Sequence, residues 1–171
     1  MIEEVLFSEE QLKKRAAELG AEISKDYEGK PILLIGILKG SLPFMADLMR
    51  RIDGDVEIDF MAVSSYGSST VSSGVVKIIK DLDHSIEGKN VIVIGDIIDT
   101  GITLSYLSKY LTDKRPASLK VCTLLDKPSR REMEVKVDYV GFQIPDKFVL
   151  GYGLDFEQKY RNLPYIGVVE E

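Results

Sequence analysis

The chain has 171 residues, of which 44% are hydrophobic and 29% charged, so it is long enough to bury a substantial core and has the composition of an ordinary globular domain. A formal net charge of −6 argues against nonspecific binding to nucleic acid or to anionic membranes, although it leaves room for a small phosphorylated ligand. The single histidine, His84, disfavours a histidine-based triad or a multi-histidine metal site.

The first residues, MIEEVLFSEEQ, are acidic and lack a long apolar core, so they do not resemble a signal peptide. No apolar run approaches the roughly 18–20 residues needed to span a bilayer. A single cysteine, Cys122, cannot form an internal disulfide, which fits a reducing compartment. We therefore expect a cytoplasmic protein with neither a membrane nor a nucleic acid as partner.

Hydrophobic periodicity predicts alternating helices and strands along the chain. Ser8 and Gln11 form a capping-box pattern, and apolar residues at helical spacing continue to Ile23, which predicts a helix over 8–26. The run PILLIGIL at 31–38 is typical of a strand buried on both faces, and a helix is expected to begin near Ser41. A helix is also predicted over about 103–112, and strands over 56–64, 75–79, 91–98, 119–125, 137–144, 148–152 and 165–169.

This order predicts an α/β fold with a doubly wound, mainly parallel sheet flanked by helices. We expect a single domain over residues 1–171, in which the hairpin around 64–74 and the C-terminal segments form a small hood lobe. Ligands bind such sheets beyond the carboxyl ends of the strands. That rule predicts one rim carrying Lys39-Gly40, residues 96–103 and Asp126-Lys127.

The stretch VIVIGDIIDTGITL, residues 91–104, begins as a buried strand and ends in a small, hydroxyl-rich turn. The turn at 100–103 would point its amides outward at a helix N-terminus, which suits a phosphate, but a plain strand–helix turn with a Thr cap has the same local pattern. A Walker A loop is excluded, because Ile102 stands where its lysine belongs. Two carboxylates, Asp96 and Asp99, precede the turn, and they suit ribose hydroxyls and Mg²⁺ rather than a bare phosphate.

An apolar strand followed by Asp-Ile-Ile-Asp-Thr-Gly-x-Thr resembles the phosphoribosyl-diphosphate (PRPP) motif of the type I phosphoribosyltransferases. Further landmarks are similar to those of the hypoxanthine-guanine phosphoribosyltransferases and occur in the same order over residues 8–169. They are the pyrophosphate loop at 38–41, the start of the catalytic lid at 65–67, the purine segments at 125–127 and 141–155, and the late arginine segment at 160–163.

The resemblance implies transfer of phosphoribose from PRPP-Mg²⁺ to N9 of hypoxanthine or guanine. Asp99 would be the general acid/base near purine N7, and Asp96 would face the ribose hydroxyls or the metal. The 5′-phosphate would lie on the loop formed by Ile98, Asp99, Thr100, Gly101, Ile102 and Thr103. Without the resemblance, Asp99 reads as a helix cap.

The same resemblance implies the remaining subsites. Lys39 and Gly40 would receive pyrophosphate, with the peptide before the glycine in cis, and Arg161 would add positive charge to the leaving group. Asp155 would bind a second Mg²⁺ on that side. On the purine side, Lys127 would donate to O6, Phe148 would stack on the ring, and the Val149 carbonyl would accept from guanine N2. The alternatives are an exposed helix-end Arg161, a surface Asp155 and a Phe148 that only fills the core.

Residues 64–75 would form a mobile lid that limits hydrolysis of PRPP, with Ser65 and Tyr66 at its start. One departure from the family pattern stands out: two adjacent acids usually precede Ile-Ile-Asp, whereas here Gly95 precedes Asp96. We expect weaker PRPP-Mg²⁺ binding as a result. The family suggests a homodimer or homotetramer. The alternatives left open are a regulatory nucleic-acid-binding protein on the same fold and an enzyme preferring xanthine.

Overall fold

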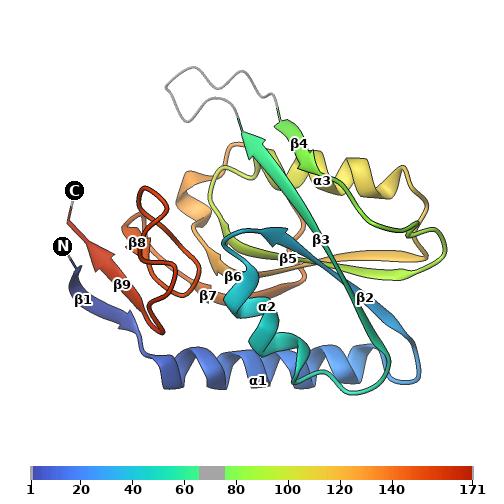
Figure 1. Cartoon of the computed structure of the whole chain (residues 1–171), viewed down its shortest axis with the longest axis horizontal. Coiled ribbons are helices and arrows are strands. Elements are labelled where there is room, and N and C mark those ends of the chain that lie inside the picture. Colours follow the sequence, from blue (N-terminus) through green and yellow to red (C-terminus); the bar gives the residue numbers. More distant parts are fainter. Residues whose placement is uncertain (1, 66–75, 171) are drawn as a thin grey trace.

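The computed structural model describes residues 2–65 and 76–170. The large sheet has six strands in the order β4-β3-β2-β5-β6-β7, and a second sheet has three in the order β1-β9-β8 (Figure 1). The strands of the large sheet are β2 (Ile32–Leu38), β3 (Val56–Ser65), β4 (Val76–Lys80), β5 (Asn90–Ile98), β6 (Ser118–Asp126) and β7 (Tyr139–Gln143). The small sheet, here called the hood, contains β1 (Ile2–Phe7), β8 (Phe148–Leu150) and β9 (Ile166–Val169).

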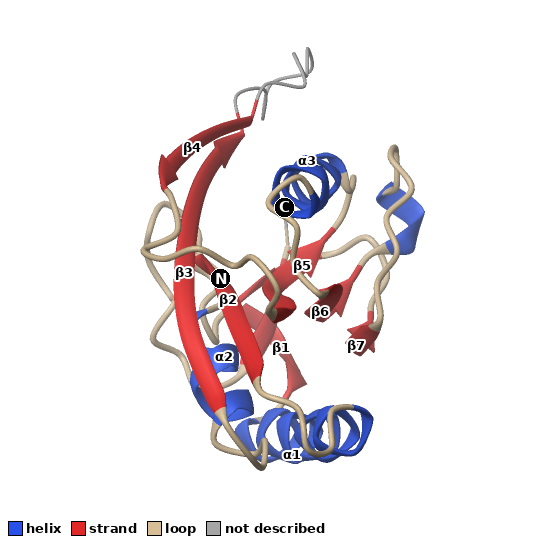
Figure 2. Ribbon diagram, turned by 90° about the vertical axis from the view of Figure 1, so that its right-hand side faces the viewer, coloured by secondary structure: helices blue, strands red, loops and turns tan. Residues whose placement is uncertain are grey.

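Five strands of the large sheet are parallel, and only β4 joins β3 in the antiparallel sense. Helices α1 (Glu9–Asp26) and α2 (Leu42–Met49) cover one face, and α3 (Ile102–Thr112) covers the other (Figure 2). A short 3₁₀ helix, η1 (Pro128–Arg130), follows β6. The prediction of a doubly wound, mainly parallel α/β sheet is therefore confirmed.

The central strand β5 separates two hydrophobic cores. Ile92 and Ile94 lie with α1, α2 and the hood, whereas Val91 and Val93 lie with α3. Alternate residues of a strand point to opposite faces, so a strand buried on both sides needs the continuous apolar run seen here. The same strand then delivers its last residues to the carboxyl edge of the sheet.

The predicted start of α1 is confirmed in atomic detail. The Gln11 amide donates to Ser8 Oγ at 3.2 Å, and the Ser8 amide donates to Gln11 Oε1 at 2.8 Å, which completes the capping box. Residues of α1 at helical spacing are buried against the sheet: Leu12, Ala16, Leu19 and Ile23.

Three expectations need correction. Residues 2–7 form strand β1, which was not predicted, and they supply an edge of the hood. The strands around the Ser/Gly-rich segment, β3 and β4, belong to the large sheet and not to the small lobe. The cis peptide bond joins Leu38 to Lys39, one bond earlier than expected.

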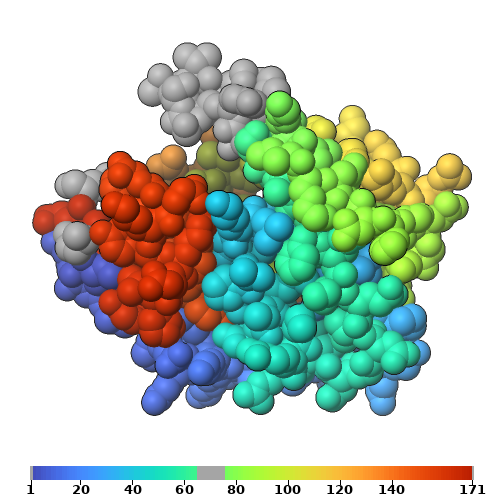
Figure 3. Space-filling view, viewed as in Figure 1, coloured from blue at the N-terminus to red at the C-terminus, as the bar shows by residue number. Residues whose placement is uncertain are grey.

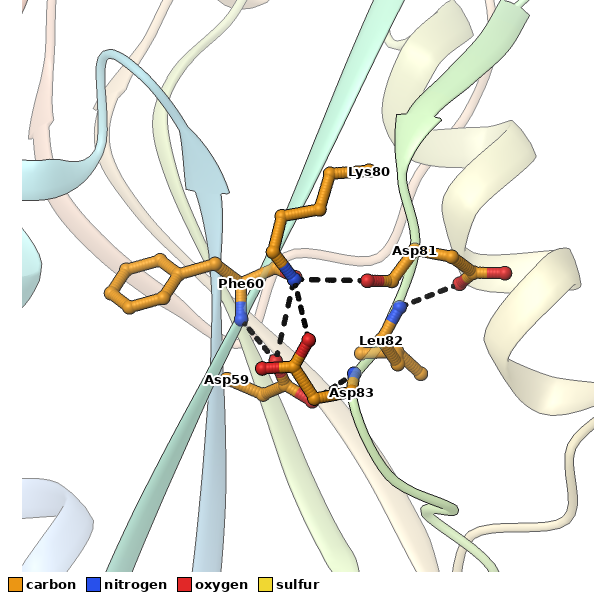
Figure 4. A network of polar contacts seen from close by, with 6 residues as sticks. All are labelled: Asp59, Phe60, Lys80, Asp81, Leu82 and Asp83. Atoms are coloured by element: carbon orange, nitrogen blue, oxygen red, sulfur yellow. Dashed lines mark hydrogen bonds and ion pairs between the residues drawn. The ribbon is translucent and has the colours of Figure 1, made fainter.

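A lysine joins the end of β4 to β3 (Figure 4). Lys80 Nζ donates to the Phe60 carbonyl at 3.0 Å and to Asp83 Oδ1 at 3.1 Å, and the buried Asp59 accepts the Asp83 amide at 2.9 Å. These contacts fix β4 and the loop after it against the parallel part of the sheet. The expected lid at 64–75, including Tyr66, falls almost wholly outside the described residues; Ser65 is the last residue of β3.

Candidate active site

The loop between β5 and α3 opens at the carboxyl edge of the sheet. Gly101 is the N-cap of α3 with φ of 84°, a left-handed conformation that suits glycine, and it caps the helix without a side chain. A Cβ at Gly101 would lie 2.5 Å from the Met133 carbonyl oxygen, so a larger residue has no room. Residues 95–101, Thr103 and neighbouring apolar side chains line a cavity of about 190 Å³.

The Asp99 side chain is exposed at this loop and does not cap α3. Its Oδ1 accepts the amide of the next residue, Thr100, at 2.6 Å, which leaves the other carboxylate oxygen open to the site. Thr100 Oγ1 accepts the Ile102 amide at 3.4 Å, while Ile98 is buried below the loop. The helix-cap interpretation of Asp99 is thus wrong.

Asp96 lies deeper than Asp99. Burial raises the pKa of its carboxyl group, hydrogen bonds from the Ile97 and Asp96 amides lower it, and Arg161 lowers it further. Gly40 is packed directly on this carboxylate, because a Cβ there would lie 1.9 Å from Asp96 Oδ2. The loop at Lys39-Gly40 therefore approaches Asp96 as closely as a backbone can.

The turn after β8 closes over the other side of the Lys39-Gly40 loop. A Cβ at Gly153 would lie 2.1 Å from the Gly40 carbonyl oxygen and 2.9 Å from Pro43. Figure 3 shows the same packing on the surface, where the C-terminal part of the chain (red) abuts the segment that follows β2 (cyan). Residues more than 100 positions apart in sequence thus form one rim.

Two cations are held together at this rim by one glutamine. Lys39 Nζ and Arg161 Nη2 each donate to Gln158 Oε1 at 3.2 Å. Arg161 also donates to the Gly153 carbonyl at 2.6 Å and pairs with Asp155 Oδ1 at 3.4 Å. Arg161 lies in a turn, so it is not the exposed helix-end residue given as the alternative. Asp155 is half-buried, so it is not simply a surface acid.

Buried polar atoms without partners are concentrated at the same place. Within the described residues, Arg161 Nε and Ser41 Oγ are two of three buried side-chain N or O atoms that lack a hydrogen bond. Buried donors of this kind ordinarily have a partner, so the unsatisfied guanidinium N–H and the hydroxyl each indicate a place where a ligand or water can bind.

The predicted purine residues lie on the opposite side of the β5–α3 loop. The Lys127 amide donates to the Ile98 carbonyl at 2.8 Å, and its largely buried side chain comes within 3.9 Å of Asp146 Oδ1. Phe148 is half-buried, lies outside both hydrophobic cores and meets Phe156 edge-on at 5.9 Å between ring centroids. The core-filler interpretation of Phe148 therefore does not hold, while Val149 is buried.

The structure brings Lys39, Gly40, Asp96, Asp155 and Arg161 together at one rim, and Lys127 joins the loop of Asp99 through the Ile98 carbonyl. Phe148 and Val149 lie on the hood strand β8, and Ser65 ends β3. Two residues at this edge, Arg131 and Gln158, were not predicted as part of the site, whereas Asp126, Asp146 and Gly153 lie within segments that were. No local motif marks Arg131 or Gln158, because each contacts a segment far away in sequence, at Asp99 and Lys39 respectively. The described residues contain no cluster of three or more His, Cys, Asp or Glu side chains that would hold a metal unaided.

A sequence profile of the phosphoribosyl transferase domain matches residues 4–157, and the chain belongs to that family. The enzyme of Bacillus subtilis called hypoxanthine-guanine phosphoribosyltransferase is 59% identical over 99% of this chain and 94% of its own length. A hypoxanthine phosphoribosyltransferase from Staphylococcus aureus has 53% identity and a TM-score of 0.95, covering 99% of this chain and 92% of that one. A hypoxanthine-guanine phosphoribosyltransferase from Bacillus anthracis has 52% identity and a TM-score of 0.95, covering 99% and 100%.

Within the family, the chain belongs to the hypoxanthine-guanine phosphoribosyltransferases, which are enzymes of purine salvage. None of the helices in the described part of the chain is long and apolar enough to span a membrane.

Proposed function

We propose that the carboxyl-edge site binds PRPP with Mg²⁺ and joins its C1′ to N9 of hypoxanthine or guanine, giving IMP or GMP and pyrophosphate. The main observation behind this proposal is the loop after β5. In this loop the carboxylate of Asp99 does not cap α3 and lies next to the backbone amides at the start of that helix. A proton acceptor and a phosphate-binding turn are therefore neighbours.

In the proposed reaction, the C1′–O bond to pyrophosphate breaks as the C1′–N9 bond forms, and Asp99 takes the proton released by the purine. The sugar passes through an oxocarbenium-like state, which nearby carboxylates stabilise and water would destroy. Thr100, Gly101 and Thr103 bind the 5′-phosphate, with Ile98 and Ile102 shaping the loop from below. Residues 64–75 are proposed to close over this centre, within a single domain spanning 1–171.

The leaving pyrophosphate is assigned to the rim formed by Lys39, Gly40 and Arg161. Its negative charge would take the place of Gln158 Oε1 between the two cations. The unpartnered Arg161 Nε and Ser41 Oγ support the assignment, because an anion with several oxygens supplies the acceptors that both lack.

Mg²⁺ is assigned to Asp96 and Asp155. Magnesium is usually held by one or two carboxylates together with substrate phosphates, so two acidic side chains beside a phosphate-binding rim fit it. When bound, the metal would neutralise charge on the departing pyrophosphate. Both carboxylates lie close enough to Arg161 for its charge to act on them.

On the purine side, Lys127 is proposed to donate to O6, Phe148 to stack on the ring and the Val149 carbonyl to accept from guanine N2. Asp146 holds the ammonium of Lys127 near the edge of the pocket, which keeps a donor available for a 6-oxopurine. Adenine presents its own donor at the same position and would leave Lys127 unsatisfied.

Initial rates with hypoxanthine, guanine, xanthine and adenine at one PRPP concentration test the proposal. We expect turnover of hypoxanthine and guanine and at least about 100-fold less with adenine, since a buried donor left without its acceptor costs several kcal/mol. A faster rate with xanthine would replace the substrate assignment. RNA retention on a filter without any turnover would overturn the enzymatic assignment of these residues.

A further inference from the structure

The segment after Lys127 packs against the β5–α3 loop. We call residues 128–133 the bracing segment. The amides of Glu132 and Met133 both donate to the Thr100 carbonyl, at 2.9 and 3.0 Å. The Met133 carbonyl in turn approaches Gly101 so closely that only glycine fits there. The loop assigned to the 5′-phosphate is therefore supported from outside by a segment that begins at the purine loop.

Arg131 is the residue of the bracing segment that touches both loops at once. Its Nη1 donates to the Asp99 carbonyl at 2.9 Å, and its Nη2 donates to Asp126 Oδ1 at 2.6 Å. The side chains are mostly buried, with 20% of Arg131 and 8% of Asp126 exposed. A planar guanidinium holds two acceptors in a fixed relation, which a flexible ammonium does not.

The two acceptors have different roles. Asp126 immediately precedes Lys127, the residue assigned to purine O6, whereas the Asp99 carbonyl belongs to the residue assigned as general acid/base. Arg131 binds Asp99 through its backbone, so the carboxylate stays free for chemistry. Breaking a buried ion pair by removing one partner leaves an uncompensated charge, which gives this contact a large influence on how both loops sit.

We propose that Arg131 is a positioning residue that fixes two loops relative to each other. They are the purine loop, which begins at Asp126-Lys127 after β6, and the ribose-phosphate loop at 99–103 between β5 and α3. The proposal rests on the site assignments made under the proposed function. A nucleotide must engage both loops simultaneously, so its affinity depends on their mutual placement, whereas a fragment that engages one loop does not sense it. Misplacement by a fraction of an ångström weakens binding and catalysis when two groups must be presented together.

The hydrogen bond from the Lys127 amide to the Ile98 carbonyl joins the same two loops at their base, independently of Arg131. Folding of the edge therefore does not depend on the guanidinium alone, and substitutions of Arg131 are expected to report on placement. Arg131→Lys keeps the charge and loses the fork, Arg131→Gln loses both, and Asp126→Asn keeps the shape and loses the charge.

Calorimetric titration with IMP and with ribose 5-phosphate, the latter measured by displacement of IMP, tests the proposal. In Arg131→Gln and Arg131→Lys we expect the affinity for IMP to fall about tenfold or more, while that for ribose 5-phosphate changes less than about twofold. Asp126→Asn should reproduce the pattern, and its effect should not add to that of Arg131→Gln. The matched control is Arg51→Gln, which removes an exposed arginine just after α2.

Equal losses of IMP and ribose 5-phosphate affinity would show local support of the phosphate loop and overturn the positioning role, as would no loss of either. Where Arg131→Gln fails to fold, Arg131→Lys and Asp126→Asn decide between these results. A wild-type protein that binds neither compound would contradict the proposed function itself, which keeps the two failures distinguishable.

Discussion

Asp96 lies near the end of β5 and Asp99 in the loop that follows, three residues away, yet their environments differ in a way that suits the different roles proposed for them. Asp99 is exposed and its Oδ1 accepts the amide that follows it, which leaves its other oxygen accessible for the general acid/base role proposed above. Asp96 is covered by Gly40, and burial raises the pKa of its carboxyl group. Asp99 is therefore accessible to a ligand. The negative charge of Asp96 is unfavourable in its buried position unless a cation or sugar hydroxyls bind it.

Replacing Asp99 separates catalysis from binding. For Asp99→Asn we expect kcat to fall about 100-fold or more, because general acid/base catalysis typically contributes that much, with the Kd for IMP changed less than about threefold. Steady-state kinetics and calorimetry of the same preparation check this. Asp113→Asn, an exposed acid at the end of α3, is the control. Equal losses in kcat and affinity would assign Asp99 to binding only.

Replacing Asp96 with Asn is expected to raise the stability of the ligand-free protein and to weaken its binding of PRPP. Because burial raises its folded pKa above the ordinary value of 3.8, protonation of Asp96 favours the folded state. This contribution is complete below the unfolded pKa and is lost as pH rises through the folded pKa. At neutral pH the ligand-free Asp96→Asn variant should thus melt higher, by about 2–4 °C for each kcal/mol recovered.

Thermal melts of both proteins across the pH range check the sign. The difference in Tm should shrink toward zero as pH falls to the ordinary value of 3.8, while the KM for PRPP rises in the variant. A lower Tm for Asp96→Asn at neutral pH would contradict the prediction.

Gly95 leaves room beside the proposed ribose site. A Cβ at this position meets nothing nearer than Thr123 Oγ1, at 3.9 Å, among the described residues. A β-carbon therefore fits at this position, and Gly95→Glu should lower the apparent KM for PRPP at limiting Mg²⁺ by adding a ligand for the metal or the sugar. Gly95→Gln fills the same space without charge. An unchanged or raised KM in Gly95→Glu would reject the prediction.

At the scale of elements, the strands that were predicted well are those with their own local signal. The apolar runs that became β2, β5 and β6 need no partner to be recognised. Strand β1 has three exposed residues in succession and gains its structure from pairing with β9 at the far end of the sequence, so no local pattern marks it. The β3–β4 pair looks like an independent hairpin, and only the parallel pairing of β2 and β3 assigns it to the large sheet.

The site residues also fall into those with a local sequence motif and those placed by contacts with distant segments. The β5–α3 loop carries its proposed chemistry in consecutive residues, so the sequence predicts both its position and its place before a helix N-terminus. Gln158 and Arg131 depend on partners 119 and 32 residues away, respectively, and have no signature of their own. The peptide isomer at Leu38–Lys39 also followed from the resemblance only approximately, displaced by one bond.

The capping box of α1 gives an element-scale prediction. Ser8→Ala removes the acceptor for the Gln11 amide and should cost about 1 kcal/mol, which lowers Tm by about 2–4 °C. Because the Ser8 hydroxyl bonds only to the first turn of α1 within the described residues, kcat should not change. Ser8→Asp retains an N-cap acceptor and is the control. A loss of activity without loss of Tm would show that α1 communicates with the site.

The molecule as a whole exposes apolar side chains on α2, β3 and β4. Leu42, Ile58 and Ile79 are 51%, 45% and 67% exposed, and β4 is an edge strand, whose unpaired backbone groups can join a second sheet. We propose that copies of the chain associate through this region as a homodimer, or as the dimer unit of a homotetramer.

Light scattering after size-exclusion chromatography tests the association. Ile79→Lys and Leu42→Lys should each reduce the mass toward that of one chain, 19.1 kDa, because a buried unpaired lysine opposes the interface. Val5→Lys, which alters an exposed apolar residue of the hood, should leave the mass unchanged. Monomeric wild-type protein, or dimers that persist in both variants, would exclude this surface.

The hood has a consequence for the order in which the chain acquires its properties during synthesis. Its central strand is β9, and β1, made first, pairs with it from Ile2 with Val169 to Phe7 with Ile166, with two shifts of register between them. On a ribosome, β1 must wait for nearly the whole chain before its sheet can form, whereas β2, β3, β5 and β6 can already pair. The nascent protein would thus hold a ribose-phosphate loop before it holds a purine pocket, and recognition of the base would be the last step of its maturation.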